Sequence, residues 1–260
     1  EDIFVTNEEA LLLKDKSAML IVVDVNLPAM TEGPELLKSV STIVVLDHHR
    51  QNNETIKNAV VSYVEPYASS TCEMVAEILQ YIVDKPKLKN IEADAMYSGI
   101  LVDTDNFVIK AGVRTFEAAA YLRRAGADVT RVRKMFREDM EHCRIRTAII
   151  NKAEIYMNEF AISTFDGANV SGATVVGAKA ANALLNIQGI RGSFVLTSLQ
   201  DCIYISARSI DELNVQVIME KFNGGGHLTM AAAQLKDVTL EEAKQQLEDV
   251  LQQMREDGDI

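Results

Sequence analysis

Asp47 ends a short β-branched run in this 260-residue chain, and two histidines, His48 and His49, follow it directly. The whole chain has only four histidines. Asp24 ends a second run of the same kind, and Asp103 stands where an apolar segment becomes polar. Carboxylates together with one neutral imidazole suit a hard or borderline ion such as Mn²⁺ or Mg²⁺. We therefore expect these side chains to gather around a divalent cation.

A cation of this kind would polarise a phosphoryl oxygen and lower the pKa of a bound water, and two ions about 3.5–4 Å apart do this better than one. A single aspartate at a strand end, such as Asp24, is more often a turn former or a helix cap than a ligand. The segment 47–49 is harder to explain in that way, because an acid and two histidines have no obvious packing use there. The chemistry indicated is metal-assisted attack on a phosphate ester.

Three consecutive glycines, Gly224, Gly225 and Gly226, precede His227 and form a second cluster. Their N–H groups can approach an anion closely, and we expect a helix that begins near His227 to aim its positive end at the same place. The alternative is a flexible turn. Arg208 lies at the end of a predicted strand and could clamp a phosphate with two hydrogen bonds, although a lone arginine there is more often a surface residue.

The elements that must position the first cluster are typical of an α/β domain. Residues 18–24 and 41–47 are predicted to be buried parallel strands, and ligands bind at the carboxyl edge of such sheets. Residues 35–40 can form a short helix between them. Three further helices are predicted, after the capping box Ser70-x-x-Glu73, over 91–102 and over 116–124.

The second half of the chain changes character after a charged segment, 128–158, which we expect to be helical and to connect two lobes. A hairpin is predicted from 193–199 and 202–207. A helix is expected near 214–221, and a last amphipathic helix is expected to start from a capping box at Thr239.

Composition excludes several classes of protein. The longest apolar stretches fall well short of the roughly 20 residues that cross a bilayer, and no basic-then-apolar leader opens the sequence. Three cysteines without close spacing support neither a disulfide framework nor a zinc site, which favours a reducing, cytoplasmic setting. The net charge of −12 argues against a long nucleic-acid duplex as partner, whereas a small phosphate ligand needs only a local cationic pocket. His142 lies among charged residues and is interpreted as a solvated side chain.

The order of these motifs resembles that of the DHH phosphoesterase superfamily, whose members include RecJ-type nucleases, oligoribonucleases and manganese inorganic pyrophosphatases. The resemblance covers essentially the whole chain. It implies an N-terminally incomplete parallel-sheet DHH lobe over 1–129, a helical connector over 130–152, and a smaller mixed α/β DHH-associated lobe over 153–260. The glycine-rich lobe argues against a pyrophosphatase.

Three segments, 23–30, 47–50 and 65–71, look closest to the membrane-anchored cyclic di-AMP phosphodiesterases. Those enzymes carry sensor and degenerate GGDEF regions upstream. This resemblance implies hydrolysis of cyclic di-AMP to the linear dinucleotide, with two Mn²⁺ ions per site. It implies that Asp24 bridges the ions and that one of them is held by His48 and Asp103. It also implies that Asp47 orients the histidine pair and that His49 faces the substrate phosphate. It further implies that phosphate and nucleotide are bound by residues of the second lobe, namely Arg208, Gly224, Gly225, Gly226 and His227. This lobe would then close on the metal centre across a cleft.

The sequence departs from the family at one point. The family opens with a strand and a His-x-Asp-x-Asp motif that supplies a histidine and two aspartates, and this sequence contains no such motif. We therefore expect a fragment of a longer parent that binds one Mn²⁺ ion or none and is weakly active or inactive.

Two other functions stay open. One is hydrolysis of very short RNA or of 3′-phosphoadenosine 5′-phosphate by the same motifs, and the other is a non-catalytic nucleotide-binding module. The expected partner in each case is a small nucleotide. Homologous proteins are often dimeric, and the resemblance implies a parent anchored at the cytoplasmic face of the membrane, with no membrane contact by this chain.

Overall fold

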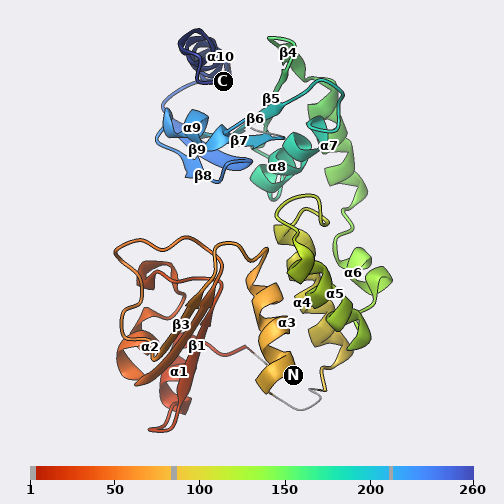
Figure 1. Ribbon diagram of the computed structural model, residues 1–260. Coiled ribbons are helices and arrows are strands. Elements are labelled where there is room, and N and C mark those ends of the chain that lie inside the picture. The colour runs from red at the N-terminus through yellow and green to blue at the C-terminus, as the bar shows by residue number, and fades with distance from the viewer. Residues whose placement is uncertain (1–3, 83–86, 211–212) are drawn as a thin grey trace. The chain divides into compact units, whose positions relative to one another are not determined.

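The computed structural model describes residues 4–82, 87–210 and 213–260. The chain divides into two compact units, Glu1–Arg137 and Glu138–Ile260 (Figure 1). Each unit contains a sheet, helices and buried clusters of its own. Among the described helices, none is both long and apolar enough to cross a bilayer.

The first unit is built on a three-stranded parallel sheet in the order β1-β2-β3. Its strands are β1 (Met19–Val23), β2 (Thr42–Asp47) and β3 (Val61–Val64). The two predicted strands are therefore confirmed and parallel, whereas β3 was not predicted. The expectation that both are buried was wrong for β1, because Met19, Ile21 and Val23 on one face of the strand are at least half exposed. The other elements of this unit are α1 (Asn7–Leu13), the 3₁₀ helix η1 (Pro28–Met30), α2 (Pro34–Ser39), α3 (Thr71–Ile82), α4 (Asn90–Asp103), α5 (Val113–Arg124) and α6 (Val129–Met135).

Two buried clusters hold this unit together. The smaller cluster joins β1 and β2 to α2 and to the loop between β2 and β3. It contains Val22, Leu37, Ile43, Val45 and Ile56. A larger one lies among α3, α4, α5 and α6, which pack side by side in Figure 1, and it includes Ala76, Tyr97, Ile100, Leu122 and Val132. Burial of these apolar side chains is the main term that stabilises each cluster.

Of the two hydrogen bonds that define the capping box expected before α3, the structure shows the one accepted by the Ser70 side chain. The Ser70 hydroxyl accepts a hydrogen bond from the backbone N–H of Glu73 at 3.0 Å, as an N-cap does. The buried Glu73 carboxylate turns elsewhere, accepting from the hydroxyls of Ser69 at 2.5 Å and Thr115 at 2.6 Å. The Glu73 carboxylate therefore joins the start of α3 to α5.

The second unit is built on a six-stranded mixed sheet in the order β4-β5-β6-β7-β9-β8. Its strands are β4 (Glu154–Tyr156), β5 (Phe160–Asp166), β6 (Gly192–Leu199), β7 (Cys202–Ser209), β8 (Gly225–Gly226) and β9 (Met230–Lys236). The predicted hairpin is confirmed as β6 and β7, and Gln200 in its turn has a φ of 55°. The helices of this unit are α7 (Met140–Asn151), α8 (Ala173–Leu184), α9 (Val215–Glu220) and α10 (Leu240–Asp257).

Helices pack against both faces of this sheet. On one face α9 and α10 pack against a cluster that includes Phe194, Ile205, Leu247, Leu251 and Met254. On the other face α7 and α8 pack against β5 and β6 through Ile149, Ala161, Val176, Leu184 and Val195. The helices expected near 214–221 and after Thr239 are confirmed as α9 and α10.

Two expectations about local structure were wrong. No helix begins at His227, because its N–H and C=O both bond to Met230 in a tight turn and the residues that follow form β9, whose alternating side chains are buried against β7. The segment 128–158 is not one helix either. Asp139 accepts from the N–H of His142 and begins α7 anew, and Glu154–Tyr156 is a strand paired with β5.

Candidate metal and nucleotide site

His48 is the centre of the first candidate cluster. Only 9% of its side chain is exposed, and its Nε2 lies 3.5 Å from Asp24 Oδ1 and 3.7 Å from Asp103 Oδ2. The opposite ring nitrogen, Nδ1, lies 3.4 Å from the carbonyl oxygen of Ala68, which can only accept a hydrogen bond. This contact favours the tautomer that leaves a lone pair on Nε2, in front of the two carboxylates.

Asp24 reaches this position through an unusual backbone conformation. It follows β1 directly and has a φ of 63°, in the left-handed region that few residues other than glycine, asparagine and aspartate adopt. Its N–H still donates to the carbonyl of Leu46 on β2, and its Oδ1 accepts from the Thr71 hydroxyl at 2.9 Å. Thr71 is thus a contact of the site that the sequence analysis did not identify.

Asp103 comes from the last residue of α4 and is partly buried. Burial raises the pKa of its carboxyl; His48 lowers it and the negative charge of Asp24 raises it further. Burial and the same two carboxylates also raise the pKa of the Cys72 thiol to about 11. The cysteine next to the cluster is therefore a neutral thiol and offers no thiolate ligand near neutral pH.

Asp47 and His49 form a separate pair at the same edge of the sheet. The fully buried Asp47 accepts from His49 Nδ1 at 2.8 Å and from the His49 backbone N–H at 3.1 Å. Its other oxygen accepts from the buried amide of Asn26 at 2.5 Å. Asp47 therefore orients the imidazole of His49, whose side chain is 45% exposed. Asn26 is a second residue that the sequence analysis missed.

The donor set at this edge fits a divalent cation. The separations between His48 Nε2 and the two carboxylates exceed a hydrogen bond, and a cation bound between them would be attracted by both carboxylates and by the lone pair of a neutral imidazole. Asp24, His48 and His49 also offer ligand atoms that all lie within 4.8 Å of one another. Oxygen and imidazole donors without thiolate are typical of Mn²⁺ and Mg²⁺.

The glycine cluster lies in the second unit. A Cβ added at Gly224 would lie 2.7 Å from Ala233 Cβ, and one added at Gly226, where φ is 150°, would lie 2.5 Å from Ala231 Cα. These two glycines are therefore required by packing against β9. At Gly225 an added Cβ would meet no atom within 4 Å.

Arg208 and His227 lie at the end of the sheet where Gly226 pairs with β9. Arg208 donates from Nε to Asn182 Oδ1 of α8 at 2.7 Å and from Nη1 to the carbonyl of Ala207 at 2.9 Å, so its guanidinium is held in place. His227 is exposed in the turn between β8 and β9. That this cluster faces the first one across a cleft stays a prediction.

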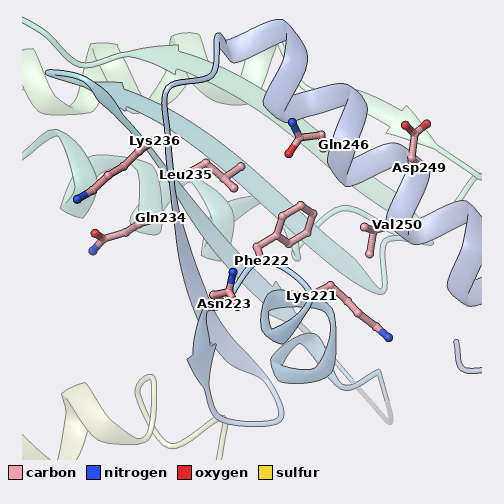
Figure 2. Close-up of a pocket in the computed structure, with 9 residues that line it drawn as sticks. All are labelled: Lys221, Phe222, Asn223, Gln234, Leu235, Lys236, Gln246, Asp249 and Val250. Carbon is pink, nitrogen blue, oxygen red and sulfur yellow. The ribbon is translucent and has the colours of Figure 1, made fainter.

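Two cavities adjoin β9 in the second unit. One of about 390 Å³ includes Gly224 and Gly225 among its lining residues. The other, of about 710 Å³, lies between β9, α9 and α10, and Figure 2 shows its lining side chains. It contains none of the residues that the sequence analysis selected. His142 is also outside both cavities, and its ring bonds to Asp139 and to the carbonyl of Ser171.

The fold and the first cluster together define a class: an α/β protein with carboxylate and histidine donors at the carboxyl edge of a parallel sheet, followed by a unit built on a mixed sheet. The sequence matches the N-terminal domain of the DHH family over residues 3–100 and the DHHA1 domain over residues 160–256. The chain therefore belongs to the DHH family, as the order of its motifs predicted.

Comparison with individual proteins agrees with this assignment. The chain is 46% identical over 244 residues to the cyclic-di-AMP phosphodiesterase PdeA of Listeria monocytogenes, an alignment that covers 94% of this chain and 37% of the relative. This similarity confirms the predicted likeness to cyclic di-AMP phosphodiesterases. The chain spans less than half the length of the curated relatives it matches.

Two solved structures confirm the predicted α/β fold. An exopolyphosphatase-related protein from Bacteroides fragilis has a TM-score of 0.82 at 20% sequence identity, covering 95% of this chain and 74% of that chain. RecJ from Thermus thermophilus in complex with Mn²⁺ has a TM-score of 0.50 at 14% identity, covering 94% of this chain and 46% of that chain.

Proposed function

We propose that this chain is the catalytic part of a phosphodiesterase that hydrolyses cyclic di-AMP to the linear dinucleotide, with Mn²⁺ held by Asp24, His48 and Asp103. The observation that carries the proposal is the position of His48 Nε2, which lies 3.5 Å from Asp24 Oδ1 and 3.7 Å from Asp103 Oδ2. The activity named for the Listeria relative, and the Mn²⁺ bound by RecJ, support the choice of substrate and metal. A bound divalent cation would supply charge stabilisation at a phosphoryl oxygen.

The protein's own groups prepare this edge for a phosphate. The bond from His49 Nδ1 to the buried Asp47 orients the ring, whose second nitrogen is Nε2. When protonated, that nitrogen can donate to a phosphate oxygen. Asn26 holds Asp47 from the other side, so His49 is positioned by a chain of two buried polar groups.

In the second unit, Arg208, Gly225 and His227 are proposed to bind the phosphate and the nucleotide. The guanidinium of Arg208 is already oriented by Asn182, which lowers the entropy lost when it binds an anion. Gly225 leaves space beside its backbone that no packing contact requires. A backbone free of side chains is what a close approach to phosphate needs.

Metal binding by the 260-residue chain tests the first half of this proposal. Titration calorimetry with Mn²⁺ should show an affinity that falls at least about tenfold in Asp103→Asn and in His48→Gln, because each removes a donor. Asp105→Asn is the matched control, since Asp105 is exposed, lies two residues away and has a φ of 44° that asparagine tolerates. Equal Mn²⁺ affinity in all four proteins would contradict the site.

Product analysis tests the second half. Cyclic di-AMP, pApA and adenosine 3′,5′-bisphosphate are supplied side by side with Mn²⁺ to the expected longer parent, because the 260-residue chain contains no His-x-Asp-x-Asp motif and is expected to be weakly active or inactive. We expect cyclic di-AMP to be consumed fastest, with pApA as product. Faster turnover of pApA or of the bisphosphate would favour the oligoribonuclease or phosphatase alternative. Nucleotide binding without any Mn²⁺-stimulated turnover would favour a non-catalytic binding module.

A further inference from the structure

The short segment 68–71, which leads into α3, contacts two of the three proposed metal ligands. The carbonyl oxygen of Ala68 lies 3.4 Å from His48 Nδ1, and the Thr71 hydroxyl donates to Asp24 Oδ1 at 2.9 Å. All four residues of the segment are buried. The groups that hold this segment in place therefore help to orient two of the ligands.

Glu73 holds the segment with both its side chain and its backbone. Its Oε2 accepts from the Ser69 hydroxyl at 2.5 Å and from the Ser69 backbone N–H at 3.3 Å, and its own N–H donates to the Ser70 hydroxyl at 3.0 Å. The same Oε2 accepts from Thr115 of α5 at 2.6 Å, and the Thr115 hydroxyl accepts from the N–H of Gly112 at 3.0 Å. Both Glu73 and Thr115 are buried, so little water competes for these bonds.

A single peptide group links Glu73 to His48. The C=O of Ala68 and the N–H of Ser69 belong to one planar unit and point in opposite directions. Glu73 accepts from the N–H end, and the C=O end faces His48 Nδ1. Because the unit is planar, fixing its N–H also fixes the direction of its carbonyl. A carboxylate at the N–H end polarises the unit as well, which makes the carbonyl a stronger acceptor.

We propose that Glu73 is a positioning residue for the metal site and acts on His48 through this peptide group. The contact with Ala68 favours a proton on His48 Nδ1, which leaves Nε2 as the nitrogen that can bind a cation. Metal-binding histidines commonly donate their other ring N–H to a carboxylate or to a backbone carbonyl. Here a backbone carbonyl is in that position, and a buried carboxylate supports it from the other end of the peptide group. This role rests on the metal site proposed above and names the groups that prepare its histidine.

The tautomer of His48 in the metal-free 260-residue chain is the first readout. Long-range ¹H–¹⁵N NMR distinguishes a protonated ring nitrogen from one with a lone pair, and His48→Gln identifies the signals. At a pH well above the ordinary histidine pKa of about 6.5, we expect the form with a proton on Nδ1 to predominate. Glu73→Ala should lower the share of this form.

Calorimetric titration with Mn²⁺ is the second readout. Glu73→Ala should lower the affinity roughly threefold to tenfold, less than the loss of roughly ten- to hundredfold typical of a directly bonded outer partner, because a peptide group intervenes. Glu73→Gln keeps an oxygen that can accept from the Ser69 N–H, so both readouts should change less than in Glu73→Ala.

Glu77→Ala is the matched control. Glu77 lies one turn further along α3, and its carboxylate accepts from Arg114 at 2.6 and 2.7 Å. This change should leave the His48 tautomer and the Mn²⁺ affinity as they are, whatever it does to stability. A merely structural role of Glu73 would likewise leave the tautomer unchanged.

Thr115→Val and Thr115→Ser keep the role of Glu73 testable if Glu73→Ala does not fold. Thr115→Val removes a hydroxyl that holds the Glu73 carboxylate and should shift both readouts in the same direction, whereas Thr115→Ser keeps the hydroxyl and should not. A proton on Nε2 of His48 in the original chain, or a tautomer that Glu73→Ala and Thr115→Val leave unchanged, would overturn the proposal. Absence of Mn²⁺ binding by the original chain would contradict the metal site instead, and the tautomer would still decide the role of Glu73.

Discussion

Replacing Gly225 by alanine separates a binding role of the glycine cluster from a packing role. An added Cβ meets no atom within 4 Å, and Gly225 is absent from the positions with positive φ. The free energy of unfolding should therefore stay the same or rise by up to about 1 kcal/mol, because alanine restricts the unfolded chain. The same methyl group would project into the open cavity, so AMP affinity should fall at least about tenfold, which corresponds to about 1.4 kcal/mol.

Gly224→Ala is the matched comparison, one residue away. Its methyl group would lie 2.7 Å from Ala233 Cβ and 2.8 Å from Ala233 Cα, so the strand must shift. Overpacking of this kind costs roughly 1–3 kcal/mol. In a protein of this size each kcal/mol lowers the melting temperature by about 2–4 °C.

Thermal unfolding and calorimetric titration with AMP, run on both variants, give the two readouts. We expect Gly225→Ala to lose AMP binding and keep its melting temperature, and Gly224→Ala to unfold at a lower temperature. If Gly225→Ala binds AMP as the unchanged chain does, the glycine is not needed for ligand approach. A large loss of melting temperature in Gly225→Ala would instead show that the space beside it is used in packing.

Two further predictions concern stability. Glu73→Ala leaves the buried hydroxyls of Ser69 and Thr115 without their acceptor, so it should lower the free energy of unfolding by about 2–4 kcal/mol. Denaturant titration measures this loss. Glu77→Ala is the control and should lower the free energy of unfolding by less, because the Glu77 carboxylate is more exposed. His142→Gln should change the pH dependence of stability. Hydrogen bonding to the Ser171 carbonyl, and then to Asp139, raises the pKa of His142, so its contribution is present below the unfolded pKa near 6.5 and is lost as the pH rises through the folded value. The melting temperature of the original chain should therefore exceed that of His142→Gln most at a pH below about 6.5, and this difference should shrink as the pH rises through the folded pKa. A difference that does not change with pH would contradict the assignment.

The strands and the acids at their ends could be predicted because both signals are local. Residues 18–24 and 41–47 are apolar runs long enough to be buried strands, and parallel pairing brings Asp24 and Asp47 to one edge. Strand β3 was missed, since Val61–Val64 is four residues long and half exposed, so its composition carries little signal. It is defined by pairing with β2, which is a tertiary contact.

The contacts that complete the site could not be predicted in the same way. Asn26 and Thr71 reach Asp47 and Asp24 across 21 and 47 residues, and neither stands out by type or spacing. The helix expected at His227 failed for a related reason. The residues after it, Met230 to Lys236, include good helix formers, but pairing with β7 buries alternate side chains and outweighs that propensity.

The left-handed backbone of Asp24 restricts which residues the position can accept. Alanine there would combine loss of the carboxylate with a conformational cost of about 1–2 kcal/mol, whereas asparagine visits that region readily. A lineage that abandoned catalysis but kept the fold would therefore reach asparagine or glycine at this position more easily than any branched residue. The residue found at position 24 in other chains thus records whether the carboxylate or only the turn has been retained.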